Sequence, residues 1–198
     1  ENDRKLFSET ELEVLEDVTA GAEPNPNLGE QRTAVILVNS IDNPIEPMTK
    51  EEVWQRIFNE SYDEDGDGIK DSVNAWIKEV SYGKAWLVGD VYGWYTIDVS
   101  QEELCSASYD EKILFNISND DINFLEYDRF LFVFPRILSC GWGGLGIIGS
   151  YVYNTPDGNV YASLSWINGL VQGIAEHELG HNFGLFHANS FIRCDAYI

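Results

Sequence analysis

Hydrophobic residues along the chain form several short runs that predict β-strands. The run Thr33 to Val38 is continuous and rich in β-branched residues, and the run Phe130 to Phe134 is stopped by Pro135. Continuous apolar runs of this length are typical of strands that are buried on both faces of a sheet. Residues 86–97 predict either one long strand or a hairpin interrupted by glycine, and the alternation from Val160 to Ile167 predicts an edge strand.

Apolar residues at helical spacing occur between these runs. Thr49 and Glu52 fit a capping box at the start of one helix, whose apolar positions continue to Phe58. A second helix is predicted over residues 72–82, and a final helix from about residue 168 to residue 183. Because strands and helices alternate along the chain, the predicted fold class is α/β with a mostly parallel sheet.

The first 31 residues lack the strong apolar pattern of the rest of the chain. They are polar and acidic, with one short predicted helix over residues 8–18 and a proline-containing linker over residues 22–27. We interpret residues 1–31 as an N-terminal arm or the remnant of a pro-segment. Residues 32–198 are the predicted globular domain.

The net charge of the chain changes the set of expected partners. The 198 residues include 12 Lys and Arg against 34 Asp and Glu, which gives a net charge of −22. A protein with this charge repels nucleic-acid backbones and anionic lipid surfaces, so neither is an expected partner. The longest apolar runs are far shorter than the roughly 20 residues of a membrane-spanning helix. Strong acidity, many aromatic residues and only three cysteines favour an exported protein whose leader has been removed.

The strongest chemical signal lies within the final predicted helix. His177, Glu178, His181, Gly184 and His187 match H-E-x-x-H-x-x-G-x-x-H at every specified position, and they include all three histidines of the chain. The first two histidines are four residues apart, so one helix face presents both imidazoles to one ion. The glycine permits a left-handed turn that ends the helix and returns the third histidine to the same ion.

These residue types predict a catalytic zinc centre. Three neutral imidazoles leave the fourth position of tetrahedral Zn²⁺ open for water, whereas structural zinc sites are closed and rich in cysteine. Glu178, next to the first ligand, is the predicted general base that takes a proton from the zinc-bound water. The expected reaction is hydrolysis of a peptide bond without a covalent intermediate.

This motif resembles the zinc signature of the metzincin metallopeptidases. The segments 79–84, 140–146 and 187–189 extend the resemblance to secreted gametolysin-like and related bacterial metalloproteases. The resemblance implies a twisted, mostly parallel sheet with an antiparallel edge strand, packed on the active-site helix. It also implies that His177, His181 and His187 bind zinc, that Glu178 is the general base and that an edge strand pairs with an extended substrate, a role here assigned to residues 160–167.

The resemblance implies a secreted zinc metalloendopeptidase that acts on extracellular proteins or peptides. One expected family feature, a methionine-containing turn beyond the third histidine, is missing, because eleven residues follow His187 and the sole methionine is Met48. The catalytic domain is therefore expected to end before this turn. The alternative is a binding or adhesion module that derives from a peptidase, holds zinc and calcium and is catalytically inactive.

An acidic segment predicts a second metal site. Asp63, Asp65, Asp67 and Asp71 are spaced as D-x-D-x-D-G-x-x-D, which resembles calcium-binding loops, although Asn74 replaces the glutamate of an EF-hand. Calcium binding and an acidic, solvated turn are both consistent with this spacing.

The cysteines and a glycine-rich segment give two further patterns. Cys105 and Cys140 are either the one internal disulfide or two buried thiols. Residues 144–149 fit G-x-G-x-x-G, but β-type and turn residues follow where a helix is required, which excludes a dinucleotide site.

Overall fold

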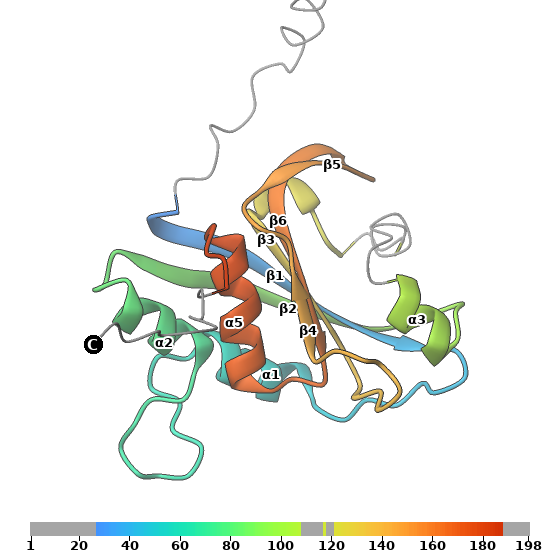
Figure 1. Cartoon of the computed structure of the whole chain (residues 1–198), viewed down its shortest axis with the longest axis horizontal. Helices are drawn as coiled ribbons and strands as arrows, with labels where there is room; N and C mark the ends of the chain where they lie inside the picture. The colour runs from blue at the N-terminus through green and yellow to red at the C-terminus, as the bar shows by residue number, and fades with distance from the viewer. Residues whose placement is uncertain (1–26, 108–116, 118–120, 188–198) are drawn as a thin grey trace, which may run out of the picture.

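A six-stranded, mostly parallel sheet forms the centre of the computed structural model, which describes residues 27–107, 117 and 121–187 (Figure 1). The strand order is β2-β1-β3-β6-β4, and β5 also pairs with β6. Neighbours from β2 to β6 are parallel, whereas β4 and β5 run antiparallel to β6. The predicted fold class, including an antiparallel edge strand, is confirmed. The strands are β1 (Gly29–Ser40), β2 (Ala85–Ile97), β3 (Arg129–Phe134), β4 (Gly144–Gly146), β5 (Tyr151–Thr155) and β6 (Gly158–Asn168).

The first two helices begin at residues whose side chains cap them, whereas Val171 at the start of the last described helix makes no side-chain capping hydrogen bond. In α1 (Lys50–Phe58) the predicted capping box is present, because the Thr49 hydroxyl accepts from the Glu52 backbone and the Glu52 carboxylate accepts from the Thr49 backbone at 2.7 Å. Ser72 caps the second predicted helix by accepting from the backbone of Ala75 at 3.1 Å. The remaining helices are α2 (Val73–Val80), α3 (Gln101–Ala107), the 3₁₀ helix η3 (Phe124–Glu126) and α5 (Gln172–Asn182).

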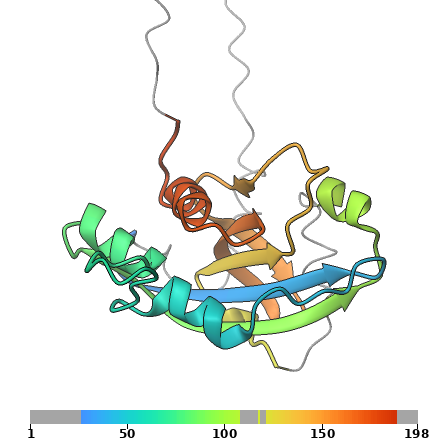
Figure 2. The same ribbon diagram turned by 90° about the horizontal axis from the view of Figure 1, so that it is seen from below.

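Two hydrophobic clusters cover the two faces of the sheet. Along β1, Val35 and Leu37 face the cluster that includes α1, α2 and α5, and Ile36 faces the opposite cluster. This alternation follows from the period of two in a strand, and it explains why the predicted strands read as continuous apolar runs. Figure 2 shows how the long strands β1 and β2 curve along their length. Helix α5 packs on one face of this sheet (Figure 1).

One strand assignment was wrong. Residues 160–167 do not form an edge strand, because β6 lies inside the sheet, hydrogen-bonded to β3 on one side and to β4 along Ser165–Ile167. The antiparallel edge strand is β4 instead. A second ambiguity is resolved, because residues 86–97 belong to the single strand β2, which pairs with β1 along its length with one irregularity between Ile36 and Val38.

Several further expectations can be compared with the structure. The predicted disulfide alternative is confirmed, since Cys105 and Cys140 are bonded with their Cα atoms 5.5 Å apart. The predicted last helix begins only at Gln172, because β6 extends to Asn168. The predicted helix over residues 8–18 lies outside the described residues, as does Cys194. No helix in the described part of the chain combines the length and apolarity that crossing a membrane requires.

Candidate metal centre

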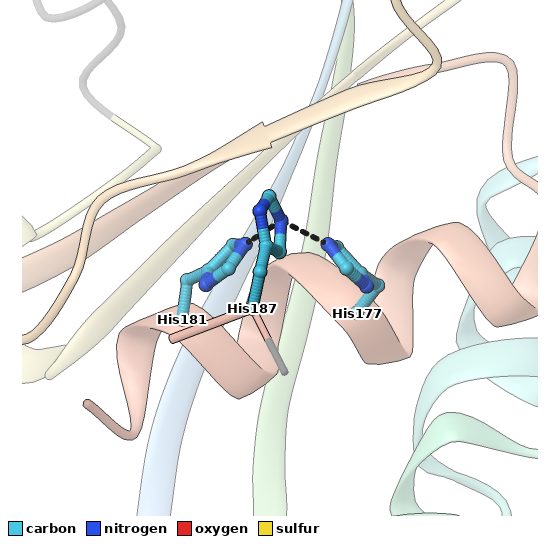
Figure 3. Close-up of side chains that lie close together, drawn as sticks. All are labelled: His177, His181 and His187. Atoms are coloured by element: carbon cyan, nitrogen blue, oxygen red, sulfur yellow. Dashed lines mark hydrogen bonds between the residues drawn. The ribbon is translucent and has the colours of Figure 1, made fainter. Parts of the chain in front are cut away.

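Three imidazoles converge at the exposed side of α5, as Figure 3 shows. Nε2 of His187 lies 3.0 Å from Nε2 of His177 and 3.1 Å from Nε2 of His181. His177 and His181 extend from successive turns of α5, and His187 reaches them from the chain beyond the helix (Figure 3). The structure therefore brings together the three histidines that the sequence motif singled out.

The turn after α5 places the third histidine. Gly184 has a φ of +91°, the left-handed conformation expected at this position, and its backbone N–H donates to the carbonyl of His181 at 2.8 Å. The next residue, Leu185, donates its N–H to the carbonyl of Gly180 at 3.0 Å. These two hydrogen bonds cap the free carbonyls of the last helical turn and redirect the chain toward the two helical histidines.

The three imidazoles have the chemistry and spacing of zinc ligands. Nδ1–H of His181 donates to the carbonyl of Leu185 at 2.7 Å, which leaves Nε2 of this neutral ring free to bind a metal. Tetrahedral Zn²⁺ with Zn–N bonds of about 2.05 Å separates ligand nitrogens by about 3.3 Å, close to both measured separations. Three nitrogen donors on the solvent side of a helix therefore fit a zinc ion with an open coordination position.

Glu178 lies beside this centre in a buried position. It is only 7% exposed, because the edge strand β4 passes directly over it. Burial raises the pKa of its carboxyl group, and the nearby His181 and His187 oppose that shift. A carboxylate that is shielded from bulk water next to a metal centre is well placed to exchange protons there.

Glycines in β4 make this close packing feasible. A Cβ added to Gly144 would lie 2.6 Å from Cγ and 2.7 Å from Oε1 of Glu178, and a Cβ on Gly146 would lie 2.5 Å from the Glu178 backbone oxygen. Such distances are well inside van der Waals contact, so a Cβ at Gly144 must displace the side chains of Glu178 and Ile174, and a Cβ at Gly146 must push against the backbone of α5. The glycine-rich segment that resembled a dinucleotide motif thus allows the edge strand to lie against α5.

Asn182 is a structural residue of the site whose role the sequence analysis missed. This fully buried side chain accepts from the Ser165 hydroxyl at 2.9 Å and donates to the carbonyls of Leu164 and Ile147, each at 2.9 Å. It therefore ties the end of α5 to β6 and to the residue that follows β4. The available signal was a polar amide on the helix directly after a metal ligand, on the side that packs against the sheet.

Arg129 is a second residue that was not singled out. Its guanidinium is fully buried at the start of β3 and lies 4.0 Å from the ring centroid of Phe183, the residue that ends α5. It donates to Gln31, Ser163 and Asn27, and burial lowers its pKa to about 10. The side chain thus remains a cation at neutral pH and packs against the end of the helix that carries His177 and His181.

A pocket of ≈440 Å³ adjoins the three histidines on the side of α5 that faces α2. Glu176 is the one carboxylate among the described residues that line it, and Gln172 donates to Oε1 of this residue at 2.9 Å. The pocket is lined by the three histidines and by Trp76, Gly173, Glu176, Gly180, Leu185 and Phe186.

The acidic loop brings some of the predicted calcium ligands together. Carboxylate oxygens of Asp63, Asp65 and Asp71 all lie within 4.8 Å of one another, and Asp67 is not part of that group. Several oxygens accept backbone hydrogen bonds, including Oδ1 of Asp63 from Gly66 at 2.7 Å. The loop therefore folds around its own carboxylates between α1 and α2.

Comparison with known proteins gives one family match. Residues 61–192, about two thirds of the chain, match the family model described as gametolysin peptidase M11. The matched range contains the acidic loop, the edge strand β4 and the whole histidine motif. No curated protein matches the chain.

Proposed function

Because the chain belongs to the gametolysin peptidase M11 family of metallopeptidases, we propose that it is a secreted, zinc-dependent endopeptidase that hydrolyses peptide bonds in extracellular proteins. The resemblance inferred from the histidine motif is confirmed by this family membership. The observation that carries the proposal is the convergence of three imidazole nitrogens beside a buried glutamate. His177, His181 and His187 are the proposed ligands, and Glu178 is the proposed general base.

In the proposed mechanism, zinc and the residues of this chain have different roles. Zinc held by the three imidazoles supplies a Lewis acid that lowers the pKa of a bound water and polarises the scissile carbonyl. The Glu178 carboxylate accepts a proton from the attacking water and then donates it to the departing amine. Its burial under β4 favours the protonated form between these two transfers, which suits a group that must hold a proton briefly. Gly184 holds the turn that brings His187 to the centre.

The edge strand β4 is the proposed guide for the substrate backbone. It is the terminal strand of the sheet, it lies directly over Glu178, and its outer backbone groups are available for β-augmentation by an extended peptide. This assignment replaces the earlier expectation for residues 160–167, whose backbone groups are used within the sheet. A peptide bound along β4 passes beside the three histidines.

The decisive experiment measures peptide hydrolysis by the zinc-loaded protein and its Glu178→Ala variant. We expect chelator-sensitive cleavage of casein by the parent protein, a loss of at least about 100-fold in the variant, and unchanged zinc content in both. Glu79→Ala, which removes an exposed glutamate on α2, is the matched control and should cleave normally. Full activity of Glu178→Ala would contradict the mechanism, whereas no cleavage by the zinc-loaded parent would favour the inactive binding module.

Secretion is supported by the Cys105–Cys140 disulfide. Stable disulfides form in oxidising compartments and are rare in reducing ones. The net charge of −22 is consistent with secretion, since a protein this acidic is not attracted to intracellular nucleic acids. Detection of the mature protein in the culture medium of its source cells would test the proposal.

We further propose that the acidic loop binds Ca²⁺ through Asp63, Asp65 and Asp71, with Asp67 in a supporting position. Three carboxylates within 4.8 Å of one another repel each other, Lys70 at 4.0 Å from Oδ2 of Asp63 offsets only one of the three charges, and calcium favours such oxygen ligands. We expect Ca²⁺ to raise the melting temperature of the parent protein but not of Asp63→Asn. An equal shift in both proteins would show that the loop is a solvated turn.

A further inference from the structure

The pocket beside the histidines has walls suited to a long side chain. Trp76 from α2 and Leu185 and Phe186 from the turn line it, and Gly173 and Gly180 of α5 contribute no side-chain bulk. Leu185 and Phe186 are 60% and 75% exposed, so their apolar surface remains available for contact. Because the three histidines line the same pocket, a side chain bound there belongs to a substrate residue next to the bond that is cleaved.

Glu176 is the one acidic side chain that the described residues contribute to this largely apolar pocket. Its Oε1 accepts a hydrogen bond from Gln172 at 2.9 Å, which holds the carboxylate against α5. Within the described residues Oε2 has no hydrogen-bond partner, so one oxygen remains available to a ligand. A partly buried carboxylate with unused hydrogen-bonding capacity is costly unless a donor occupies the pocket.

From these contacts we infer that the pocket binds a lysine or arginine side chain of the substrate, with Glu176 as the specificity-determining residue. The inference rests on the proposed peptidase function. The methylene stem of such a side chain packs along Leu185 and Phe186, and its charged end reaches the Glu176 carboxylate. Trp76 adds a ring face that attracts cations.

The charge of the whole protein acts in the same direction. A net charge of −22 raises the local concentration of cationic peptides and disfavours acidic ones. An apolar side chain of similar length fills the pocket equally well but leaves Glu176 desolvated without a donor, so it binds more weakly. An acidic side chain adds direct repulsion.

A peptide series that varies one residue tests this inference. Fluorogenic peptides identical except for lysine, norleucine or glutamate beside the scissile bond are compared by kcat/KM, and the cleaved bond is located by mass spectrometry. We expect the parent protein to prefer lysine over norleucine by roughly tenfold and to cleave the glutamate peptide most slowly. In Glu176→Gln, which keeps a hydrogen-bond acceptor for Gln172, the lysine preference should fall several-fold, to the small preference that Trp76 and the net charge give without Glu176.

The control variant separates local recognition from general attraction. Glu79→Gln removes the same charge from an exposed position on α2 outside the pocket, so the roughly tenfold lysine preference should persist. Equal cleavage of the lysine and norleucine peptides by the parent protein would overturn the inference. An undiminished lysine preference in Glu176→Gln would also overturn it.

Binding measurements keep this test separate from that of the proposed function. Calorimetry with the uncleaved peptides and zinc-loaded Glu178→Ala protein should show lysine binding roughly tenfold tighter than norleucine, and adding Glu176→Gln should reduce this ratio several-fold. If the parent protein cleaves no peptide, the proposed function fails, and this binding ratio decides whether the pocket recognises cationic side chains. Equal binding of the lysine and norleucine peptides overturns the inference.

Discussion

At the scale of single residues, Arg129 shows how helix α5, which carries His177 and His181, is supported by a group outside the histidine site. Its buried guanidinium makes a bidentate contact with Gln31, reaches Ser163 at 3.0 Å and packs against the Phe183 ring. A lysine at this position keeps the charge but loses the planar fork and the stacking surface. We expect Arg129→Lys to lower the free energy of unfolding by about 2 to 3 kcal/mol, measured by urea denaturation.

The control for this substitution is Arg136→Lys. Arg136 is exposed, so the same exchange there should change the free energy of unfolding by less than about 0.5 kcal/mol. Equal stabilities of Arg129→Lys and the parent protein would contradict the supporting role of Arg129.

The contrast between Arg129 and the histidines explains how much of the site the sequence predicts. His177, Glu178 and His181 lie on one helix, and Gly184 fixes the turn to His187, so local geometry alone brings this set together. Arg129 and Asn182 act through partners that lie far away in the sequence. Their spacing carries no periodic signal, and only the strand pairing shows which side chains they meet.

At the scale of elements, the strongly patterned segments are the ones that the sequence predicts correctly. The core strands and the capped helices α1 and α2 are confirmed because apolar runs and capping boxes are local signals. Helix α3 also begins with a capping box, formed by Ser100 and Glu103, a signal that the sequence analysis did not use. Strand β4 has no comparable signal, because its three residues include two glycines.

The position of β6 could not be predicted for a different reason. Alternation of apolar and polar residues favours a half-exposed strand, but the polar members of β6 are buried by pairing and by α5. Ser165, for example, donates to Asn182 of the metal-binding helix. The buried polar residues of β6 form internal hydrogen bonds. Their spacing in the sequence is the same as that of polar residues that face solvent, so spacing alone cannot tell the two cases apart.

Strand β4 provides a direct test of how packing sets the position of Glu178. We expect Gly144→Ala to lower kcat by roughly 10- to 100-fold, because the added methyl group must displace the Glu178 side chain. Zinc content should change little, since the added methyl group meets Glu178 and Ile174 and none of the three histidines. The matched control is Gly141→Ala, whose added Cβ meets no atom within 4 Å, and normal kcat in Gly144→Ala would refute the packing argument.

Helix α1 provides a test of pH dependence. Hydrogen bonds from the backbone and side chain of Thr49 lower the pKa of Glu52 below its model-peptide value of 4.5. A lowered pKa in the folded state means that the stabilisation is fully present above pH 4.5 and is lost as the pH falls through the folded-state value. Glu52→Gln should therefore be less stable than the parent protein at pH 7, and this difference should shrink under strongly acidic conditions.

Urea denaturation of Glu52→Gln and the parent protein, at pH 7 and at a pH well below 4.5, measures this difference in stability. Glu51→Gln changes the same charge at the same helix end but leaves the capping box intact, so it is the control. A stability difference between Glu52→Gln and the parent protein that does not vary with pH would contradict the capping explanation.

At the scale of the whole molecule, the Cys105–Cys140 disulfide joins α3 to the segment that leads into β4. The two cysteines are 35 residues apart, and closing a loop of this length stabilises the folded state by about 3 to 4 kcal/mol in the chain-entropy treatment. We expect the double variant Cys105→Ala/Cys140→Ala to lose about that free energy of unfolding. Reducing agent should lower the stability of the parent protein but not that of the double variant.

The double variant should lose stability but keep its activity, because hydrogen bonds hold β4 in place independently of the disulfide. Asn168 donates to the carbonyl of Trp142 at 2.9 Å through its side chain and to that of Gly143 at 2.8 Å through its backbone. Beyond the strand, Gly149 donates to the carbonyl of His181 at 2.9 Å. The folded double variant should therefore keep a kcat/KM within about threefold of the parent protein while it inactivates faster on heating. A large loss of kcat/KM in the folded variant would show instead that the disulfide itself holds the edge strand over Glu178.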